Sequence, residues 1–225
     1  VQDISWKENL RVAWFGSFLT GASISLVVPF MPIFVEQLGI EGDQVAFYAG
    51  LAISVSAVSA ALVSPIWGIL ADKYGRKPMM IRAGLAMTIT MGGLAFVPNI
   101  YWLLFLRLLN GVFTGFVPNA TALIASQVPK DKSGAALGTL STGVVAGTLT
   151  GPFVGGFIAE IFGIRNVFLL VGAFLFLAAI LTIFFIKEDF QPVAKEKAIP
   201  TKEVFSSFKY PRLLVNLFLT SFVIQ

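Results

Sequence analysis

The 225-residue sequence contains no cysteine and no histidine. Without cysteine there is neither a disulfide framework nor a thiolate metal site, and without histidine the commonest metal ligand and general base are missing. An enzyme is therefore not expected, and neither is a cofactor or a metal. Charge is also scarce, because Asp, Glu, Lys and Arg make up 12% of the chain, against about 25% in an ordinary soluble domain.

Apolar residues make up 56% of the chain and lie in long runs. A helix needs about 20 mostly apolar residues to cross the hydrocarbon core of a bilayer. The predicted spans are 10–35, 46–71, 79–97, 101–126, 135–162 and 167–186, followed by the start of a seventh at 213–225. The sequence thus predicts an all-α polytopic membrane protein. The net charge of +4 does not indicate nucleic-acid binding, since the basic residues lie in short loops between spans.

The domain organisation follows from a change of composition after the sixth span. We expect residues 1–186 to form a bundle of six transmembrane helices. Residues 187–212 are polar and contain three prolines, which predicts a cytoplasmic linker between two halves. Residues 213–225 are apolar again, as expected for a truncated seventh helix. Because the chain starts with valine and stops inside an apolar run, we expect it to be about half of a longer protein.

The basic residues predict the orientation in the membrane, because cytoplasmic loops hold an excess of Lys and Arg. All but two of the 16 basic residues precede span one or follow spans two, four and six, and Arg82 is among those that follow span two. The exceptions are Arg107, within span four, and Arg165, between spans five and six. We therefore expect a cytoplasmic N-terminus.

The turn between spans two and three reads Gly-Ile-Leu-Ala-Asp-Lys-Tyr-Gly-Arg-Lys-Pro. Gly68 would let a neighbouring helix approach, and Gly75 permits the positive φ of a chain reversal. Asp72 lies at the membrane boundary beside Arg76 and Lys77. A carboxylate there is stabilised when it faces a guanidinium or the N-terminus of a helix, and breaking that contact would release one conformation. The alternative is a solvated loop that only orients the chain.

Arg107 is the only formally charged side chain well inside a predicted span. A guanidinium buried in the membrane costs several kcal/mol unless it is paired or hydrated. Arg107 lies about six residues, or about 9 Å, from the outer end of its helix. Two interpretations remain open: a functional buried charge, and a side chain that extends to the outer headgroups.

Glycine and proline mark spans one, four and five. In span five, Gly143, Gly147, Gly151 and Gly155 recur every four residues and make a face on which another helix can pack closely, and Pro152 follows. Pro29, Pro32 and Pro118 each remove a backbone hydrogen bond and are expected to kink spans one and four. Gly21 with Val28-Pro29 also resembles Gly111 with Val117-Pro118, as expected for an internal repeat.

These motifs resemble those of the major facilitator superfamily. The turn is similar to the loop signature of that family, which places a conformational lock against its second half at Asp72 and Arg76. The segment from Arg107 to Gly115 resembles a motif whose arginine is implicated in proton coupling. The antiporter motif of drug/proton exchangers is similar to the set Gly138, Gly147, Gly151, Pro152, Gly155 and Gly156. The resemblance implies a six-helix bundle of two inverted three-helix repeats.

Longer segments, at 26–32, 116–129 and 138–143, resemble the twelve-span MdtG-like and PmrA-like multidrug exporters. This resemblance implies a proton-driven exporter of amphiphilic drugs in a bacterial plasma membrane. The implied partners are the amphiphilic substrate, protons, the lipid bilayer and the protein's own C-terminal half. Three alternatives stay open: a symporter or uniporter for a small solute, a carrier of lipid-like molecules, and a sensor or scaffold that transports nothing.

A substrate cavity is expected near the midplane, between the two halves. Its candidate lining residues in this chain are Thr20, Ser25, Pro29, Asn110, Asn119 and Thr148. No Asp or Glu is central in any predicted span, and Glu36 and Glu160 lie near outer ends. A proton-carrying carboxylate needs a burial that neither position offers. We therefore expect that carboxylate in the missing half.

Overall fold

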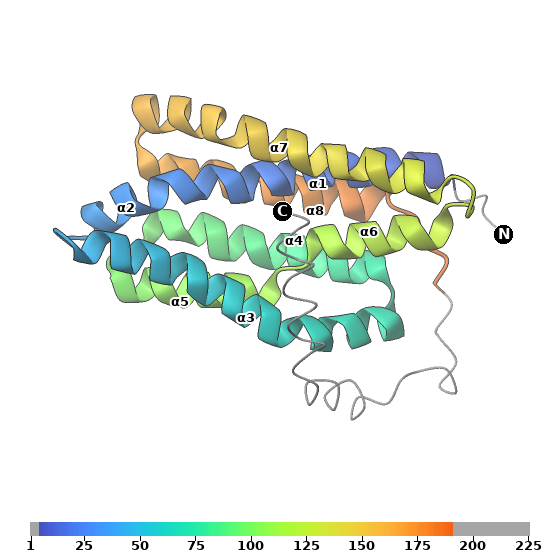
Figure 1. Ribbon diagram of the computed structural model, residues 1–225, viewed down its shortest axis with the longest axis horizontal. Helices are drawn as coiled ribbons and strands as arrows, with labels where there is room; N and C mark the ends of the chain where they lie inside the picture. The colour runs from blue at the N-terminus through green and yellow to red at the C-terminus, as the bar shows by residue number, and fades with distance from the viewer. Residues whose placement is uncertain (1–4, 191–225) are drawn as a thin grey trace. The chain divides into compact units, whose positions relative to one another are not determined.

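The computed structural model describes residues 5–190, and this part of the chain is built of helices (Figure 1). Six helical segments in it are long and apolar enough to cross a membrane. They agree with the six predicted spans to within about one helical turn at each end. The predicted seventh span, and the predicted linker beyond residue 190, lie outside the described residues.

Two of the six spans consist of more than one helix. Span one comprises α1 (Trp6–Val27), the short 3₁₀ segment η1 (Val28–Phe30) and α2 (Met31–Gln37). Span two is α3 (Gln44–Tyr74), and span three is α4 (Arg76–Gly93), extended by a 3₁₀ turn η2 (Leu94–Phe96). Span four comprises α5 (Ile100–Phe113) and α6 (Phe116–Gln127), while spans five and six are α7 (Ser133–Phe162) and α8 (Ile164–Phe185).

Span one is interrupted where its prolines predict an irregularity. The backbone tightens to a 3₁₀ helix over Val28–Phe30, which contains Pro29. Pro32 follows in the first turn of α2, where the missing N–H leaves no hydrogen bond unmade. The interruption lies in the C-terminal third of the span, at the first of the two prolines.

Span four breaks before its proline, whereas the sequence suggested a kink at Pro118. The helix ends at Phe113 and restarts at Phe116, and Gly115 between them has a φ of 132°, a value that side chains disfavour. Pro118 lies in the first turn of α6. A proline cannot donate to the carbonyl four residues earlier, which here is Thr114, so its effect falls one turn upstream of the ring.

The spans pack in pairs that relate the two halves of the bundle. Span one packs along span five, span two along span four, and span three along span six. Exchanging the first three spans for the last three leaves this pattern unchanged, as two three-helix repeats require. Spans one and four run in opposite directions (Figure 1). The predicted fold class is confirmed.

Two helices leave most of their apolar surface uncovered. Within the 18-residue apolar stretch of each span, only 22% is buried in span two and 17% in span five, whereas 56% is buried in span one. The outer face of α7 carries Leu149, Phe153 and Phe157, all exposed. Such contiguous apolar faces require a cover of lipid or protein.

Candidate functional site

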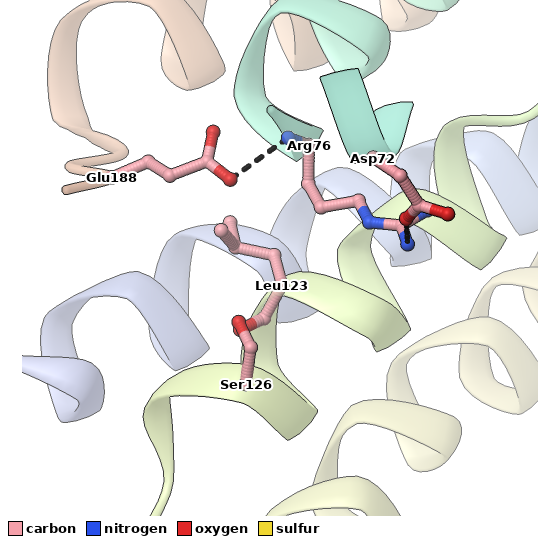
Figure 2. Close-up of polar contacts among 5 residues, drawn as sticks. All are labelled: Asp72, Arg76, Leu123, Ser126 and Glu188. Carbon is pink, nitrogen blue, oxygen red and sulfur yellow. Dashed lines mark hydrogen bonds and ion pairs between the residues drawn. The ribbon is translucent and has the colours of Figure 1, made fainter. Parts of the chain in front are cut away.

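The turn between α3 and α4 brings its charges together. The Nη2 atom of Arg76 donates to Oδ1 of Asp72 at 2.5 Å (Figure 2). Gly75, between them, has a φ of 99°, as the predicted chain reversal requires. The side chain of Asp72 is 57% exposed, so this ion pair by itself contributes at most about 1 kcal/mol to stability. A contact this weak can exchange partners readily.

Glu188, just past the end of α8, caps the N-terminus of α4. Its two carboxylate oxygens accept hydrogen bonds from the backbone N–H groups of Arg76, at 2.8 Å, and Lys77, at 2.7 Å, and Figure 2 shows the first of these. The first N–H groups of a helix have no partner within the helix, and the helix dipole favours an anion at that end. The sequence suggests such a role for Asp72 but gives no sign of it for Glu188, 112 residues away from Arg76.

Two other members of the predicted turn act differently from expectation. No atom of the described residues lies within 4 Å of a Cβ built on Gly68, so in this half no helix approaches there. Gly68 instead lines a cavity. Lys77 contributes to the turn through its backbone N–H.

A cavity of about 350 Å³ lies between α3 and the break in span four. Its volume is in the range of small-molecule sites. Small and apolar residues dominate the lining, which consists of Ala60, Ala61, Ser64, Trp67, Gly68, Arg76, Gly111, Thr114, Gly115, Pro118 and Asn119. The cavity therefore joins the predicted gating turn, through Gly68 and Arg76, to the discontinuous part of span four. Of the six predicted cavity residues, Asn119 lines it.

Arg82 closes the backbone break of span four beside this cavity. Its Nη2 atom donates to the carbonyl oxygens of Phe113, at 3.2 Å, and Thr114, at 3.1 Å. These are the carbonyls left free by the end of α5 and by Pro118. The guanidinium also stacks on Trp67, 3.4 Å from the ring centroid. The sequence presents Arg82 as one more loop cation, because nothing local reveals these contacts.

We expect Arg82→Lys to lower the stability of the bundle although it keeps the charge. A lysine cannot both stack on Trp67 and bridge two carbonyls, so about 1–2 kcal/mol of unfolding free energy should be lost. Arg11→Lys is the matched control, because Arg11 is exposed. Thermal unfolding of the full-length protein in detergent measures the effect, and equal melting temperatures for the two variants would contradict it.

Arg107 lies inside the bundle, which excludes the alternative of a side chain extended to the headgroups. It is 6% exposed, and its Nε atom donates to the carbonyl of Ala52 in α3 at 3.1 Å. In return, Ser56 in α3 donates its hydroxyl to the carbonyl of Arg107 at 2.6 Å. Nη1 lies 3.6 Å from the sulfur of Met91. Among residues 5–190 no carboxylate pairs with Arg107.

The other five predicted cavity residues lie away from this cavity. Thr20 is buried and its hydroxyl donates to Gly16 in its own helix, while Asn110 accepts from Thr90 in α4. Ser25 in α1 donates to the carbonyl of Thr148 in α7 at 2.7 Å. Pro29 is exposed at the interruption of span one. Ser25, Thr148 and Asn110 therefore join neighbouring helices, and none of the five residues lines the cavity.

The glycines of span five pack directly on α1. A Cβ at Gly143 would lie 2.7 Å from the carbonyl oxygen of Trp14, and one at Gly151 would lie 2.7 Å from that of Ala22. Gly147 meets the backbone of Phe18 and Ala22, and Gly155 the side chain of Leu26. Gly138 and Gly156 differ, because no atom of residues 5–190 lies within 4 Å of a Cβ built on either. Pro152 is accommodated inside α7.

Glycines also allow close helix contact in spans one and four. A Cβ at Gly21 of α1 would lie 2.7 Å from the carbonyl oxygen of Val144 in α7. A Cβ at Gly111 of α5 would overlap Ser56 and Ser59 of α3. The two glycines that mark the faint sequence repeat therefore occupy equivalent places in the two repeats.

Comparison with known proteins agrees with this architecture. Residues 13–225 match the family model of the Major Facilitator Superfamily. The chain belongs to this superfamily.

Proteins with similar sequences are named as multidrug efflux pumps or multidrug resistance proteins. The multi-drug resistance efflux pump PmrA of Streptococcus pneumoniae is 88% identical over 99% of this chain and 56% of its own length. Its homolog in Lactococcus lactis is 54% identical over 99% of this chain and 55% of the homolog's length. The multidrug resistance protein MdtG of Proteus mirabilis is 51% identical, with 98% and 55% covered. The chain thus spans about half the length of these relatives.

Solved structures from the superfamily share the fold. The human organic anion transporter MFSD10 superposes with a TM-score of 0.72 at 18% identity, over 87% of this chain and 50% of its own. The POT family transporter PepTSo gives a TM-score of 0.74 at 14% identity, over 85% of this chain and 40% of its own. At such identities the likeness concerns the major facilitator fold alone.

Proposed function

We propose that this chain is the N-terminal half of a transporter that exports amphiphilic drugs in exchange for protons by alternating access. The observation that carries the proposal is the 88% identity to a multidrug efflux pump across 99% of the chain. The bundle would occupy residues 1–186, with a cytoplasmic linker at 187–212 and a seventh helix from 213. It would lie in a bacterial plasma membrane with its N-terminus in the cytoplasm, an orientation supported by the distribution of Lys and Arg.

The turn between α3 and α4 is the proposed gate. Its residues are Gly68, Asp72, Gly75, Arg76 and Lys77, and they would close the inner side against the C-terminal half. Two observations support this role: Asp72 is more than half exposed, and no described residue approaches Gly68. Both positions are therefore free to receive a second surface. The weak Asp72–Arg76 pair would break and re-form as that surface leaves and returns.

Span five is the proposed rigid partner of span one. The close contact of Gly147 and Gly151 with α1 supports movement of the two helices as one body. Gly138, Pro152 and Gly156 complete the proposed antiporter motif. Because Gly138 has no close neighbour among the described residues, it remains available to face the other half.

Arg107 is the proposed proton-coupling residue of this half. It is buried, and its hydrogen bonds go to a carbonyl and a thioether and not to a carboxylate. A buried cation of this kind would stabilise the charged form of a carboxylate brought near it and lower the proton affinity of that group. Glu36 and Glu160 are exposed in this structure, so we assign the proton-carrying carboxylate to the C-terminal half.

The cavity beside the gate is the proposed entrance of the substrate path. Its lining offers apolar surface from alanines and Trp67, and hydrogen-bonding groups from Ser64 and Asn119. Loose apolar surface of this kind accepts amphiphiles of different shapes. Thr20, Ser25, Pro29, Asn110 and Thr148 would act by setting the positions of the helices around it.

Dye efflux from energised bacteria tests the proposal. Cells that express the full-length protein containing this chain should export an amphiphilic fluorescent dye, and a protonophore should stop them. Uptake in place of efflux would indicate a symporter or uniporter, and export of a fluorescent phospholipid alone a lipid carrier. No movement of either probe would indicate a protein that does not transport. Each of these three results would overturn the proposal.

The same assay tests the gate. Asp72→Asn should reduce efflux at least tenfold, because it removes the charge that pairs with Arg76. Asp43→Asn is the matched control: Asp43 precedes α3 at its other end, is exposed and makes no side-chain cap. If both variants export dye at the wild-type rate, the turn is not the gate.

A further inference from the structure

Lys187 and Glu188, just past the end of α8, contact three other spans. The backbone N–H of Lys187 donates to Oδ1 of Asn9 at 2.9 Å, and its carbonyl accepts from Nδ2 of Asn9 at 2.6 Å. Nε2 of Gln127 donates to the same carbonyl at 3.0 Å. Asn9 and Gln127 also bond to each other at 2.7 Å. Glu188 then reaches the first turn of α4.

We call these four residues, Asn9, Gln127, Lys187 and Glu188, the inner clasp. They belong to α1, to the end of α6 and to the segment that follows α8, and the contact with α4 adds a fourth span. Asn9 is 1% exposed and makes contacts with both of its polar groups. A buried amide with this many partners fixes the path of the backbone that passes it. The position from which Glu188 extends is therefore set by spans one and four.

The turn is shaped to receive the carboxylate of Glu188. A Cβ on Gly75 would lie 2.8 Å from Oε2 of Glu188, closer than real Cβ atoms approach an oxygen. Gly75 thus permits the reversal of the chain and, because it has no side chain, leaves room for this carboxylate. Arg76 is held at two points, by Glu188 at its backbone and by Asp72 at its side chain. The Asp72–Arg76 pair is consequently formed on a backbone that Glu188 keeps in place.

We propose that Glu188 is a positioning residue of the gate. It couples the segment leading out of α8 to the turn, so that the gate closes only while Glu188 caps α4. This inference rests on the proposed function, since it assigns a control element to the same gate. A pull on the chain after Glu188 would withdraw the carboxylate, leave the first N–H groups of α4 without a partner, and loosen the Asp72–Arg76 pair.

Accessibility of the cavity from the inner side tests the inference without requiring transport. A reporter cysteine at Ser64, an exposed residue of the cavity lining, is introduced into the full-length protein made free of other cysteines. Inside-out membrane vesicles are treated with a membrane-impermeant maleimide, and the labelling rate is measured. Glu188→Gln should raise that rate about fivefold, because an amide offers one acceptor and no charge to two N–H donors. Glu188→Asp, which keeps the charge but is shorter, should give a smaller rise.

Asp189→Asn is the matched control, because Asp189 is the neighbouring carboxylate and is exposed. It should label at the wild-type rate. A wild-type rate in Glu188→Gln, or an equal rise in Asp189→Asn, would overturn the inference. Equal melting temperatures of Glu188→Gln and the wild type would show that the change in rate reflects the gate and not unfolding. If the wild type moves no dye but Glu188→Gln still labels faster, the proposed function fails and the positioning role of Glu188 stands.

Discussion

Gly147→Ala should destabilise the bundle, whereas Gly156→Ala in the same helix should not. Alanine favours helix formation over glycine by about 1 kcal/mol, so in an uncrowded place the change is neutral or stabilising. Gly156 is such a place, because no atom of the part of the chain that the structure describes lies within 4 Å of the position that an added Cβ would take. At Gly147 the new methyl group would overlap the backbone of Phe18 and lie 2.7 Å from the nitrogen of Ala22.

The two variants should therefore shift stability in opposite directions. Backbone atoms cannot move aside as a flexible side chain can, so α1 and α7 would have to separate. Overpacking of this kind costs about 1–3 kcal/mol, which should lower the melting temperature of the full-length protein by a few degrees. Thermal unfolding in detergent measures both. A lower melting temperature for Gly156→Ala than for Gly147→Ala would contradict the packing of span five on span one.

Arg107→Met should abolish proton-coupled transport while the protein still folds. Methionine fills a similar space without the charge, and loss of the hydrogen bond from the guanidinium to the carbonyl of Ala52 costs about 1–3 kcal/mol. Proton-coupled efflux should fall at least tenfold if the buried charge adjusts the proton affinity of a carboxylate in the other half. The rate at which dye addition releases or consumes protons, followed with a pH-sensitive probe in vesicles, measures the coupling.

Arg165→Met is the control for that experiment. Arg165 likewise donates to backbone carbonyls, those of Ala95 at 2.8 Å and Val97 at 3.2 Å, at the end of span three away from the α3–α4 turn. Its removal should lower stability by a comparable amount and leave the coupling intact. An equal loss of coupling in both variants would mean that Arg107 acts through stability alone.

The six spans could be predicted from the sequence because their cause is local. The thickness of the hydrocarbon core sets the length of each apolar run, and each of the six runs within residues 5–190 forms a helical span of about the expected length. The glycine face of span five is also visible in the sequence, since Gly143 to Gly155 recur at the helical period. Which helix would cover that face is not visible there, and the structure identifies it as α1.

The break in span four shows the limit of local inference. The sequence predicts a kink at Pro118. Its missing N–H, however, affects the carbonyl of Thr114, one turn earlier, and the helix breaks there, at Thr114 and Gly115. The residue type alone therefore predicts an irregularity at Pro118. The structure has it one turn earlier, at the carbonyl of Thr114, to which Pro118 cannot donate.

The contacts of Arg82 and Glu188 could not be predicted from the sequence for another reason. These helices are apolar on nearly every side, so their rotation about their own axes has no clear hydrophobic face to set it. Whether Arg82 faces the cytoplasm or the end of α5, and whether Glu188 reaches α4, depends on that rotation and on the distant partners. Neither residue carries a local pattern that reveals its role.

The most direct test of proton-driven export uses the purified full-length protein in liposomes with an imposed pH gradient. A permanently charged dye is added outside, because such a dye does not distribute by pH alone. Antiport predicts that the dye accumulates when the lumen is acidic, as protons leave in exchange, and that Asp72→Asn abolishes the accumulation. Accumulation in an alkaline lumen, or at the same rate without a gradient, would contradict proton antiport.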